Sequence, residues 1–175
     1  MTMIQNADQA DLEEIISLYH LATEYQKSVA KKYWKGFDRE MIINDIEEKN
    51  QWKIMVDDVI ACIFCTTFSD PLIWAEKNGD PAVYLHRIAT RPDFRGKGFM
   101  KQIVNWTTDF AFQNNKKFIR MDTGSGNDKL NNYYIRNGFD FLGTTTLGQT
   151  KGLPEHYKDG TSSLFQLDLS ILVKY

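Results

Sequence analysis

The spacing of apolar residues divides the chain into alternating strands and helices. Apolar side chains recur every three or four positions from Leu12 to Ala22, as on one buried face of a helix. Shorter runs of branched and aromatic residues are typical of strands. The pattern predicts strands at residues 2–6, 52–56, 59–68, 82–90, 118–123, 139–147 and 162–169, and helices between Asp11 and the break at Gly36, then at 38–49, 96–114 and 127–137.

The order of these segments indicates the fold class. Strands interleaved with single helices are typical of a mixed α/β sheet, in which ligands bind at the ends of strands. The dipeptide Asp57-Asp58 predicts a hairpin between two of the strands. The polar segment 69–81 is expected to be a long loop, either functional or a surface excursion.

Composition and charge narrow the class of protein. With 42% hydrophobic and 13% aromatic residues in 175 positions, the chain is expected to fold as one globular domain over residues 1–175. A formal net charge of −2 argues against a broad nucleic-acid surface. The first residues do not resemble a signal peptide, and no apolar run reaches the roughly 20 residues of a membrane span. A soluble, cytoplasmic protein is therefore expected.

Two cysteines, Cys62 and Cys65, have the spacing of a redox pair or of half a zinc site. They lie in a predicted strand, where side chains three positions apart point to opposite faces. A second pair of metal ligands is also missing. We therefore expect two buried thiols and no metal.

A glycine-rich turn, Arg95-Gly96-Lys97-Gly98, joins a predicted strand to a predicted helix. Glycine lets the backbone approach a ligand closely, and the free N–H groups at the start of a helix attract anions. Flanking cations strengthen the case for a phosphate site. From these residues alone, an ordinary solvated turn is about as plausible.

The turn resembles the coenzyme-A motif of the GNAT-type N-acetyltransferases, and residues 88–94 are similar to its usual lead-in. A second element, Asn127, Tyr134 and Gly138-Phe139, is similar to the closing pattern of the same family. The resemblance covers about residues 82–143. It implies a single GNAT-like α/β domain with a mixed, mostly antiparallel six- to seven-stranded sheet, flanked by helices and with splayed central strands. It also implies acetyl transfer from acetyl-CoA to a primary amine.

The same resemblance implies which residues bind the coenzyme. Backbone amides after the fourth strand would orient the pantetheine, and the loop with the start of its helix would hold the pyrophosphate. The expected contacts are Ile88, Thr90, Arg95, Gly96, Lys97, Gly98, Phe99, Met100 and Asn127. Asn127 also stands where a helix N-cap belongs, so it can serve both purposes. Met100 departs from the motif, which ends in a small residue, and its side chain must point away from the pyrophosphate.

Tyr134 matches the tyrosine that protonates the coenzyme-A thiolate in many members of the family. The alternative is a packed aromatic residue held through its hydroxyl group, with Tyr133 as the substitute acid. His86 is the candidate general base, because a histidine titrates near neutral pH. It could instead be structural, and Tyr84 could order a water chain. We expect Asp122 simply to pair with Arg120.

The acceptor is left open. Its contacts are expected in the variable parts of the chain, at Tyr25, Tyr33, Trp34, segment 69–81 and residues 155–157. A small-molecule amine is favoured, while a protein or peptide amine and a non-catalytic acyl-CoA sensor are the alternatives. Members of the family are often dimers, so a homodimer is conceivable. No nucleic acid or membrane partner is expected.

Overall fold

The computed structural model describes residues 2–148 and 150–171, which form two compact units. The first unit holds the residues up to Thr66, His86–Phe99 and Pro154–His156, and the second holds Thr67–Leu85, Met100–Leu153 and the chain from Tyr157 on. Strand β4 (Ala82–Thr90) contributes its second half to the first unit and its first half to the second. The two units are described in turn.

The first unit is built on an antiparallel sheet. Strands β1 (Thr2–Asn6), β2 (Gln51–Val56) and β3 (Val59–Thr67) lie in that order, followed by the second half of β4. Asp57 and Asp58 both adopt positive φ angles, 47° and 66°. Positive φ at both central residues is the signature of a tight two-residue hairpin turn. The predicted hairpin is thereby confirmed.

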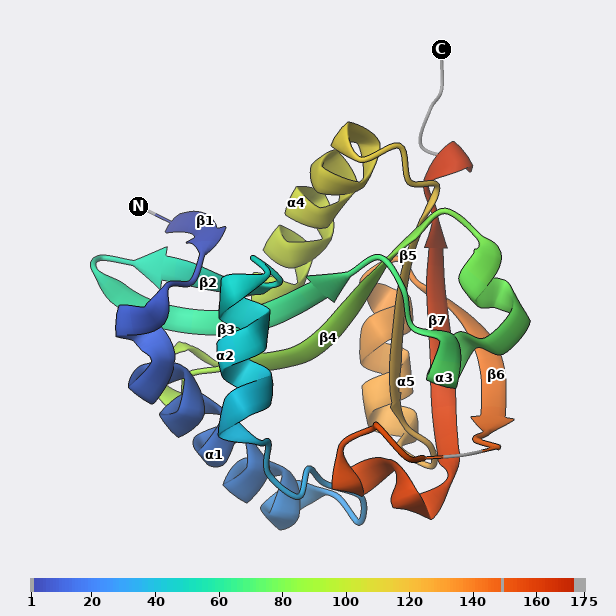
Figure 1. Ribbon diagram of the computed structural model, residues 1–175, viewed down its shortest axis with the longest axis horizontal. Coiled ribbons are helices and arrows are strands. Elements are labelled where there is room, and N and C mark those ends of the chain that lie inside the picture. Colours follow the sequence, from blue (N-terminus) through green and yellow to red (C-terminus); the bar gives the residue numbers. More distant parts are fainter. Residues whose placement is uncertain (1, 149, 172–175) are drawn as a thin grey trace. The chain divides into compact units, whose positions relative to one another are not determined.

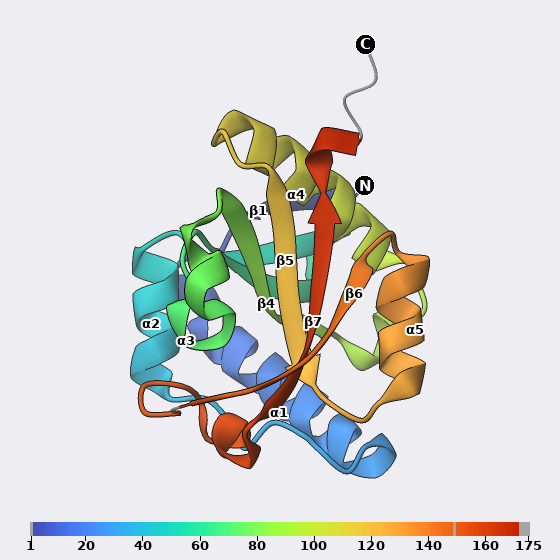
Figure 2. The same cartoon turned by 90° about the vertical axis from the view of Figure 1, so that its right-hand side faces the viewer.

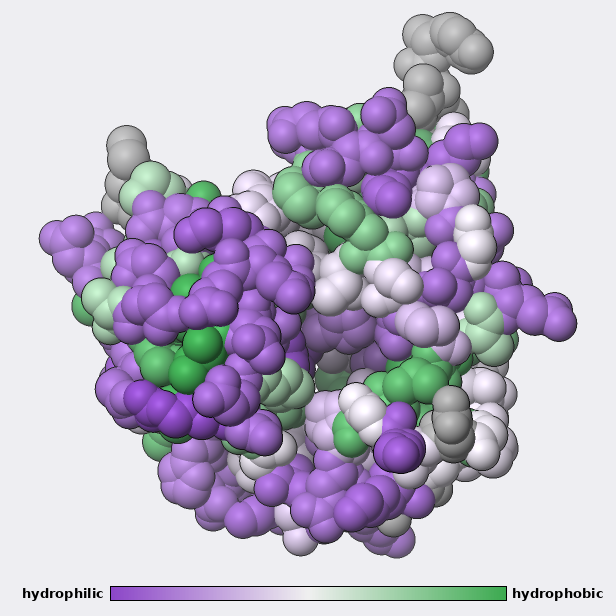
Figure 3. Space-filling view, in the orientation of Figure 1, coloured by the Kyte–Doolittle hydropathy of each residue, from purple (hydrophilic) through white to green (hydrophobic). Residues whose placement is uncertain are grey.

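Helices α1 (Leu12–Val29) and α2 (Arg39–Glu47) pack on this sheet, and α2 lies in front of β3 in Figure 1. A short helical turn capped by Asp8 leads into α1. The apolar faces of the two helices join one core cluster with residues of β3 and β4, including Ile15, Ile46 and Ile63. The outward face of α2 is mostly hydrophilic (Figure 3). The amphipathic pattern thus explains which face of each helix is buried.

The second unit contains the first half of β4, then β5 (Phe118–Gly124), β7 (Thr161–Asp168) and β6 (Asp140–Thr146), side by side in that order (Figure 2). The β4–β5 pair is parallel, and the other two pairs are antiparallel. Its helices are α3 (Pro71–Trp74), α4 (Phe99–Gln113) and α5 (Asp128–Arg136). The strands β1 to β7 together form one seven-stranded sheet, as predicted.

Two boundaries differ from the prediction. Segment 69–81 is not a plain loop, because it forms α3 and a 3-10 helix over Ala75–Gly79. Such short turns have too few residues to show a helical repeat. The helix expected from residue 96 begins at Phe99. Its three preceding residues remain in the loop, where the two glycines adopt positive φ angles.

The pairing and the backbone conformation of strand β4 change halfway along the strand. The pairs with β5 that the structure describes run from Ala82↔Phe118 to Leu85↔Met121, although both strands continue. Arg87 then adopts a φ of 51°, in the left-handed region that a non-glycine residue rarely occupies. Its side chain forms an ion pair with Asp45 of α2 and a hydrogen bond to Cys65 Sγ. These contacts hold the strained backbone where β4 loses its pairing with β5.

Candidate active site

The loop Arg95–Gly98 has the form that an anion site needs. Gly96 and Gly98 adopt φ angles of 77° and 75°, and a Cβ built on either would meet nothing within 4 Å. The four residues of the loop are exposed, and α4 begins at Phe99 directly after them. The first N–H groups of a helix have no partner within the helix. The loop therefore offers open space, free donors and cationic side chains to a pyrophosphate.

Met100 does not obstruct this loop. Met100 is only 4% exposed to solvent, and the neighbouring Phe99 is 5% exposed. Both side chains therefore lie in the interior, while their backbone N–H groups belong to the first turn of α4. Arg95 lies on the surface with its guanidinium carbon 3.8 Å from the centroid of the Tyr25 ring. This cation–π contact places the charge of Arg95 beside α1.

The amides of Ile88 and Thr90 lie on the second half of β4. The Arg91 N–H donates to the Ala61 carbonyl of β3 at 2.9 Å. Because successive N–H groups alternate between the two edges of a strand, those of Ile88 and Thr90 point to the edge away from β3. This orientation agrees with the role that the family resemblance implies for them.

Asn127 is a helix cap. Its side-chain oxygen accepts a hydrogen bond from the Leu130 N–H at 3.0 Å, at the start of α5. The N-cap role is thereby confirmed, and the coenzyme contact stays a prediction.

Tyr134 sits on α5 among aromatic rings, with its ring centroid 5.2 Å from that of Phe165 and 6.5 Å from that of Phe139. In the described part of the chain its hydroxyl group has no hydrogen-bond partner. Burial, together with the charges of Tyr133 and Asp122, raises the pKa of the Tyr134 phenol. The group is therefore a neutral phenol with a proton to donate, and packing through a hydroxyl hydrogen bond is not what holds it.

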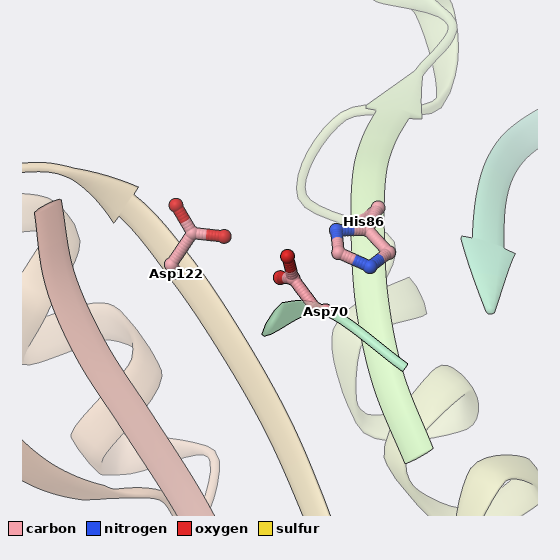
Figure 4. Close-up of side chains that lie close together, drawn as sticks. All are labelled: Asp70, His86 and Asp122. Atoms are coloured by element: carbon pink, nitrogen blue, oxygen red, sulfur yellow. The ribbon is translucent and has the colours of Figure 1, made fainter. Parts of the chain in front are cut away.

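His86 lies on β4, at the start of its second half (Figure 4). Burial, assisted by the neighbouring charge of Arg87, lowers the pKa of its imidazole to about 3. The ring is therefore neutral at physiological pH. A base with so low a pKa is poorly matched to removing a proton from an ammonium group.

The expected pair between Arg120 and Asp122 is wrong. Arg120 is only 1% exposed and pairs instead with Asp80, while its Nε donates to Gln166 Oε1 at 2.9 Å. Successive side chains on β5 alternate faces, but Arg120 and Asp122 share one, so spacing alone suggested the pair. The turn before β4 supplies the nearer carboxylate. Asp122 is thus left available, and it accepts a hydrogen bond from Tyr157 at 3.2 Å.

A cavity of about 400 Å³ opens in the first unit between α1, α2 and the segment that joins them. Tyr33 and Trp34, two of the expected acceptor contacts, line it, and Tyr25 is not among its lining residues. Two further aromatic residues at the cavity, Tyr19 and Phe37, were not expected there, and their rings lie 4.9 Å apart beside Trp34. The sequence did place Tyr19 on the buried face of α1, and this position was the feature that could have identified it.

Two further features concern the cysteines and the length of the helices. Cys62 and Cys65 are both buried free thiols, as the strand pattern predicted. None of the helices within residues 2–148 and 150–171 combines the length and apolar composition that a membrane span requires.

A glycine loop between a β-strand and a helix, on a mostly antiparallel α/β sheet, is the arrangement expected of a coenzyme-A-dependent acyltransferase. The sequence model of the acetyltransferase (GNAT) family matches residues 10–139. The chain therefore belongs to the GNAT family of acetyltransferases, which use acetyl-CoA as the acetyl donor, and the predicted fold class is confirmed.

Individual relatives agree with this assignment. The chain is 25% identical over 146 residues to the uncharacterised N-acetyltransferase YesJ of Bacillus subtilis, covering 79% of this chain and 81% of that one. A GNAT-family acetyltransferase structure from Listeria monocytogenes matches with a TM-score of 0.76 and 25% identity, over 96% of this chain and 95% of that one.

A third structure, the putative acetyltransferase yncA of Salmonella typhimurium with its cofactor acetyl-CoA, has a TM-score of 0.67 and 15% identity, over 97% and 94% of the two chains. Other neighbours of the same fold are named for acceptors as different as a ribosomal-protein alanine and glutamate. The fold therefore does not decide the acceptor.

Proposed function

We propose that this chain transfers the acetyl group of acetyl-CoA to the primary amine of a small molecule, by direct attack in a ternary complex. The donor half of the proposal rests on the family and on the loop Arg95–Gly98. The residues expected to bind the coenzyme include the amides of Ile88 and Thr90 and the first turn of α4, as argued above. Holding both reactants in one orientation supplies much of the rate enhancement in such a transfer.

The observation that favours an enzyme over a sensor is the state of Tyr134. A phenol whose pKa is raised keeps its proton at neutral pH and is therefore in the donor form. Its O–H can stabilise the negative charge that develops on the coenzyme-A sulfur as the C–S bond breaks. We assign Tyr134 the role of general acid.

The acceptor class is argued from the cavity in the first unit. Its aromatic wall of Tyr19, Trp34 and Phe37 suits an apolar body and can face a cationic amine. The one carboxylate among the lining residues of this cavity, that of Glu24, is already paired with Lys27 at 2.6 Å. A volume of about 400 Å³ accommodates a small molecule and falls within the size range of ligand pockets. An extended peptide requires an open groove instead, so we favour a small amine over a protein terminus.

The test is release of free thiol from acetyl-CoA across a panel of small amines, with a panel of peptides as comparison. Tyr134→Phe should lower kcat by about 10²- to 10⁴-fold, because it removes a general acid. Its affinity for coenzyme A should stay within about twofold of wild type. The matched control is Tyr133→Phe, since Tyr133 is 45% exposed on the same helix.

Each outcome has a defined meaning. Coenzyme binding with no turnover on any acceptor would support the sensor, and turnover on peptides alone would support a protein acetyltransferase. Equal activity of Tyr134→Phe and Tyr133→Phe would remove Tyr134 from the mechanism.

A further inference from the structure

A pair of carboxylates lies within the second unit and is not explained by the contacts described so far. Asp70 precedes α3, and Asp122 lies on β5, one residue beyond its last described pair with β4. Figure 4 shows the two side chains pointing toward each other, and an oxygen of each lies within 4.8 Å of the other. Fifty-two positions separate them in sequence, so the fold alone brings them together.

In the described part of the second unit no cation forms an ion pair with either carboxylate, and the Asp122 residue is half-buried. Asp70 is only 8% exposed. The Oδ2 atom of each carboxylate is shielded from solvent and lacks a hydrogen-bond partner among the described residues. Buried carboxylate oxygens are normally paired or hydrogen-bonded, because an unmet charge is costly in a low dielectric. Two carboxylates this close, each with one such atom, indicate a shared proton or a cationic ligand.

The charge state of the pair agrees with this reading. Burial raises the pKa of Asp122 to about 6, although the Tyr157 hydroxyl opposes the shift. Burial, with the charge of Asp122, raises the pKa of Asp70 to about 7. Two carboxylates so close titrate as a coupled pair. Near neutral pH the pair therefore holds about one proton and one negative charge.

The pair also interacts with the candidate acid. Asp122 and Tyr134 belong to the same unit, and the charge of Asp122 contributes to the raised pKa of the Tyr134 phenol. A proton acceptor and a proton donor thus lie within electrostatic range of each other, on β5 and on α5. Acid and base groups with separated pKa values are what an amine acetylation requires.

We infer that Asp122 is the general base of the reaction and that the pair it forms with Asp70 receives the ammonium group of the acceptor. The inference deepens the proposed function and rests on it. Asp122 would contact the acceptor nitrogen and is the catalytic member of the pair. Asp70 acts through Asp122 and is a positioning residue.

An N–H bond of the acceptor ammonium breaks, and its proton joins the Asp122 carboxylate, which leaves a lone pair on nitrogen. That pair forms the N–C bond to the thioester carbonyl, and the C–S bond then breaks with its electrons on sulfur. Tyr134 gives its proton to the thiolate and regains one from the newly bonded nitrogen. Asp122 releases its proton to solvent, so one proton leaves per turnover.

Asp122 suits this step better than His86 does. The most effective base has a pKa near the working pH, and Asp122 with a pKa of about 6 comes closer than His86 with a pKa of about 3. The carboxylate pair also carries net negative charge, which attracts an ammonium group. A neutral imidazole does not.

The experiment compares Asp122→Asn and Asp70→Asn with wild type in kcat/KM against pH, for an amine that the wild type accepts. Asparagine keeps the shape of the side chain and the oxygen that accepts from Tyr157. The matched control is Asp109→Asn, an exposed carboxylate on α4. Coenzyme-A affinity and the thermal unfolding midpoint are measured for each variant.

Wild-type activity should rise with pH through a step near pH 6 to 7, since the pair must lose a proton before it can act. The acceptor amine ionises well above that range. Within the second unit the titratable groups that interact with Asp122 are Asp70, Tyr157 and Tyr134, and only Asp70 titrates near neutral pH. When Asp122 ionises, Asp70 still holds its proton, because burial and the charge of Asp122 raise the pKa of Asp70. Asp70→Asn should therefore leave the step near pH 6 in place, remove any further change near pH 7, and keep the plateau within about tenfold.

Asp122→Asn should abolish the step and lower kcat/KM by about 10²- to 10⁴-fold at pH 7, with coenzyme affinity unchanged. An unchanged step and rate in a folded Asp122→Asn would overturn the inference while wild-type turnover upholds the proposed function. A loss of more than about tenfold at every pH in Asp70→Asn, or a step moved by a full pH unit, would also overturn it. Activity that a chelator removes and Mg²⁺ restores would assign the pair to a metal instead. A wild type that turns over no amine would refute both proposals.

Discussion

Gly98 offers the sharpest test of where the coenzyme's pyrophosphate binds. At a φ of 75° this residue is in the left-handed region, and a side chain there would extend into open space rather than into the protein. Gly98→Val therefore has two separable effects. It strains the backbone of the loop, and it fills the space that we assign to a phosphate group.

The strain has a predictable size. Holding a residue with a Cβ in the left-handed region costs about 1–2 kcal/mol. For a chain of 175 residues, that corresponds to a fall of about 2–8 °C in the unfolding midpoint. Gly143→Val is the matched control, because Gly143 has a φ of 99°, also has nothing within 4 Å of a built Cβ, and lies on β6. Both variants should be destabilised to a similar extent.

Only Gly98→Val should also lose coenzyme affinity. Losing one N–H hydrogen bond to a charged phosphate costs about 1.5–3 kcal/mol, which weakens binding by about 10- to 140-fold. Calorimetric titration with coenzyme A measures this directly. If Gly98→Val and Gly143→Val bound coenzyme A equally well, the pyrophosphate would not lie at this loop.

Two further predictions concern buried side chains. Met100→Ala should destabilise the fold by about 2–5 kcal/mol in chemical denaturation, because it empties a packed site, yet leave coenzyme affinity within about twofold; a large loss of affinity with little change in stability would show that Met100 contacts the coenzyme. Burial raises the pKa of the Cys62 thiol to about 12, so neither Cys62 nor Cys65 should react with an alkylating reagent at pH 8 until the protein unfolds. Labelling of the native protein at the rate of a free thiol would contradict this.

Much of the fold followed from local patterns. The hairpin at Asp57-Asp58, the buried stripe of α1 and the glycine loop each depend on residues close together in sequence, and the structure agrees with all three. Such features can be predicted from the sequence because backbone angles and helical faces are set by neighbouring residues. Segment 69–81 was missed for the converse reason, since its helical turns are too short to have a period.

The partners of charged residues were less predictable. Arg120 was expected to pair with Asp122, two positions away, and instead pairs with Asp80, forty positions away. Arg87 adopts a left-handed backbone conformation that the neighbouring sequence does not predict. Its side chain forms an ion pair with Asp45 of α2. Charged side chains form ion pairs with groups that are close in space, and the packing of helices and strands determines which groups are close.

The sequence by itself therefore determined the donor chemistry of this protein, because the coenzyme motif is a contiguous loop with dihedral angles that only glycine adopts freely. Tertiary structure alone decided the acid–base groups. Asp70 and Asp122 become a pair only when β5 and the turn before α3 meet, and only burial gives their carboxyl groups pKa values near neutral pH. Burial is a property of the assembled core, and no single stretch of sequence carries it.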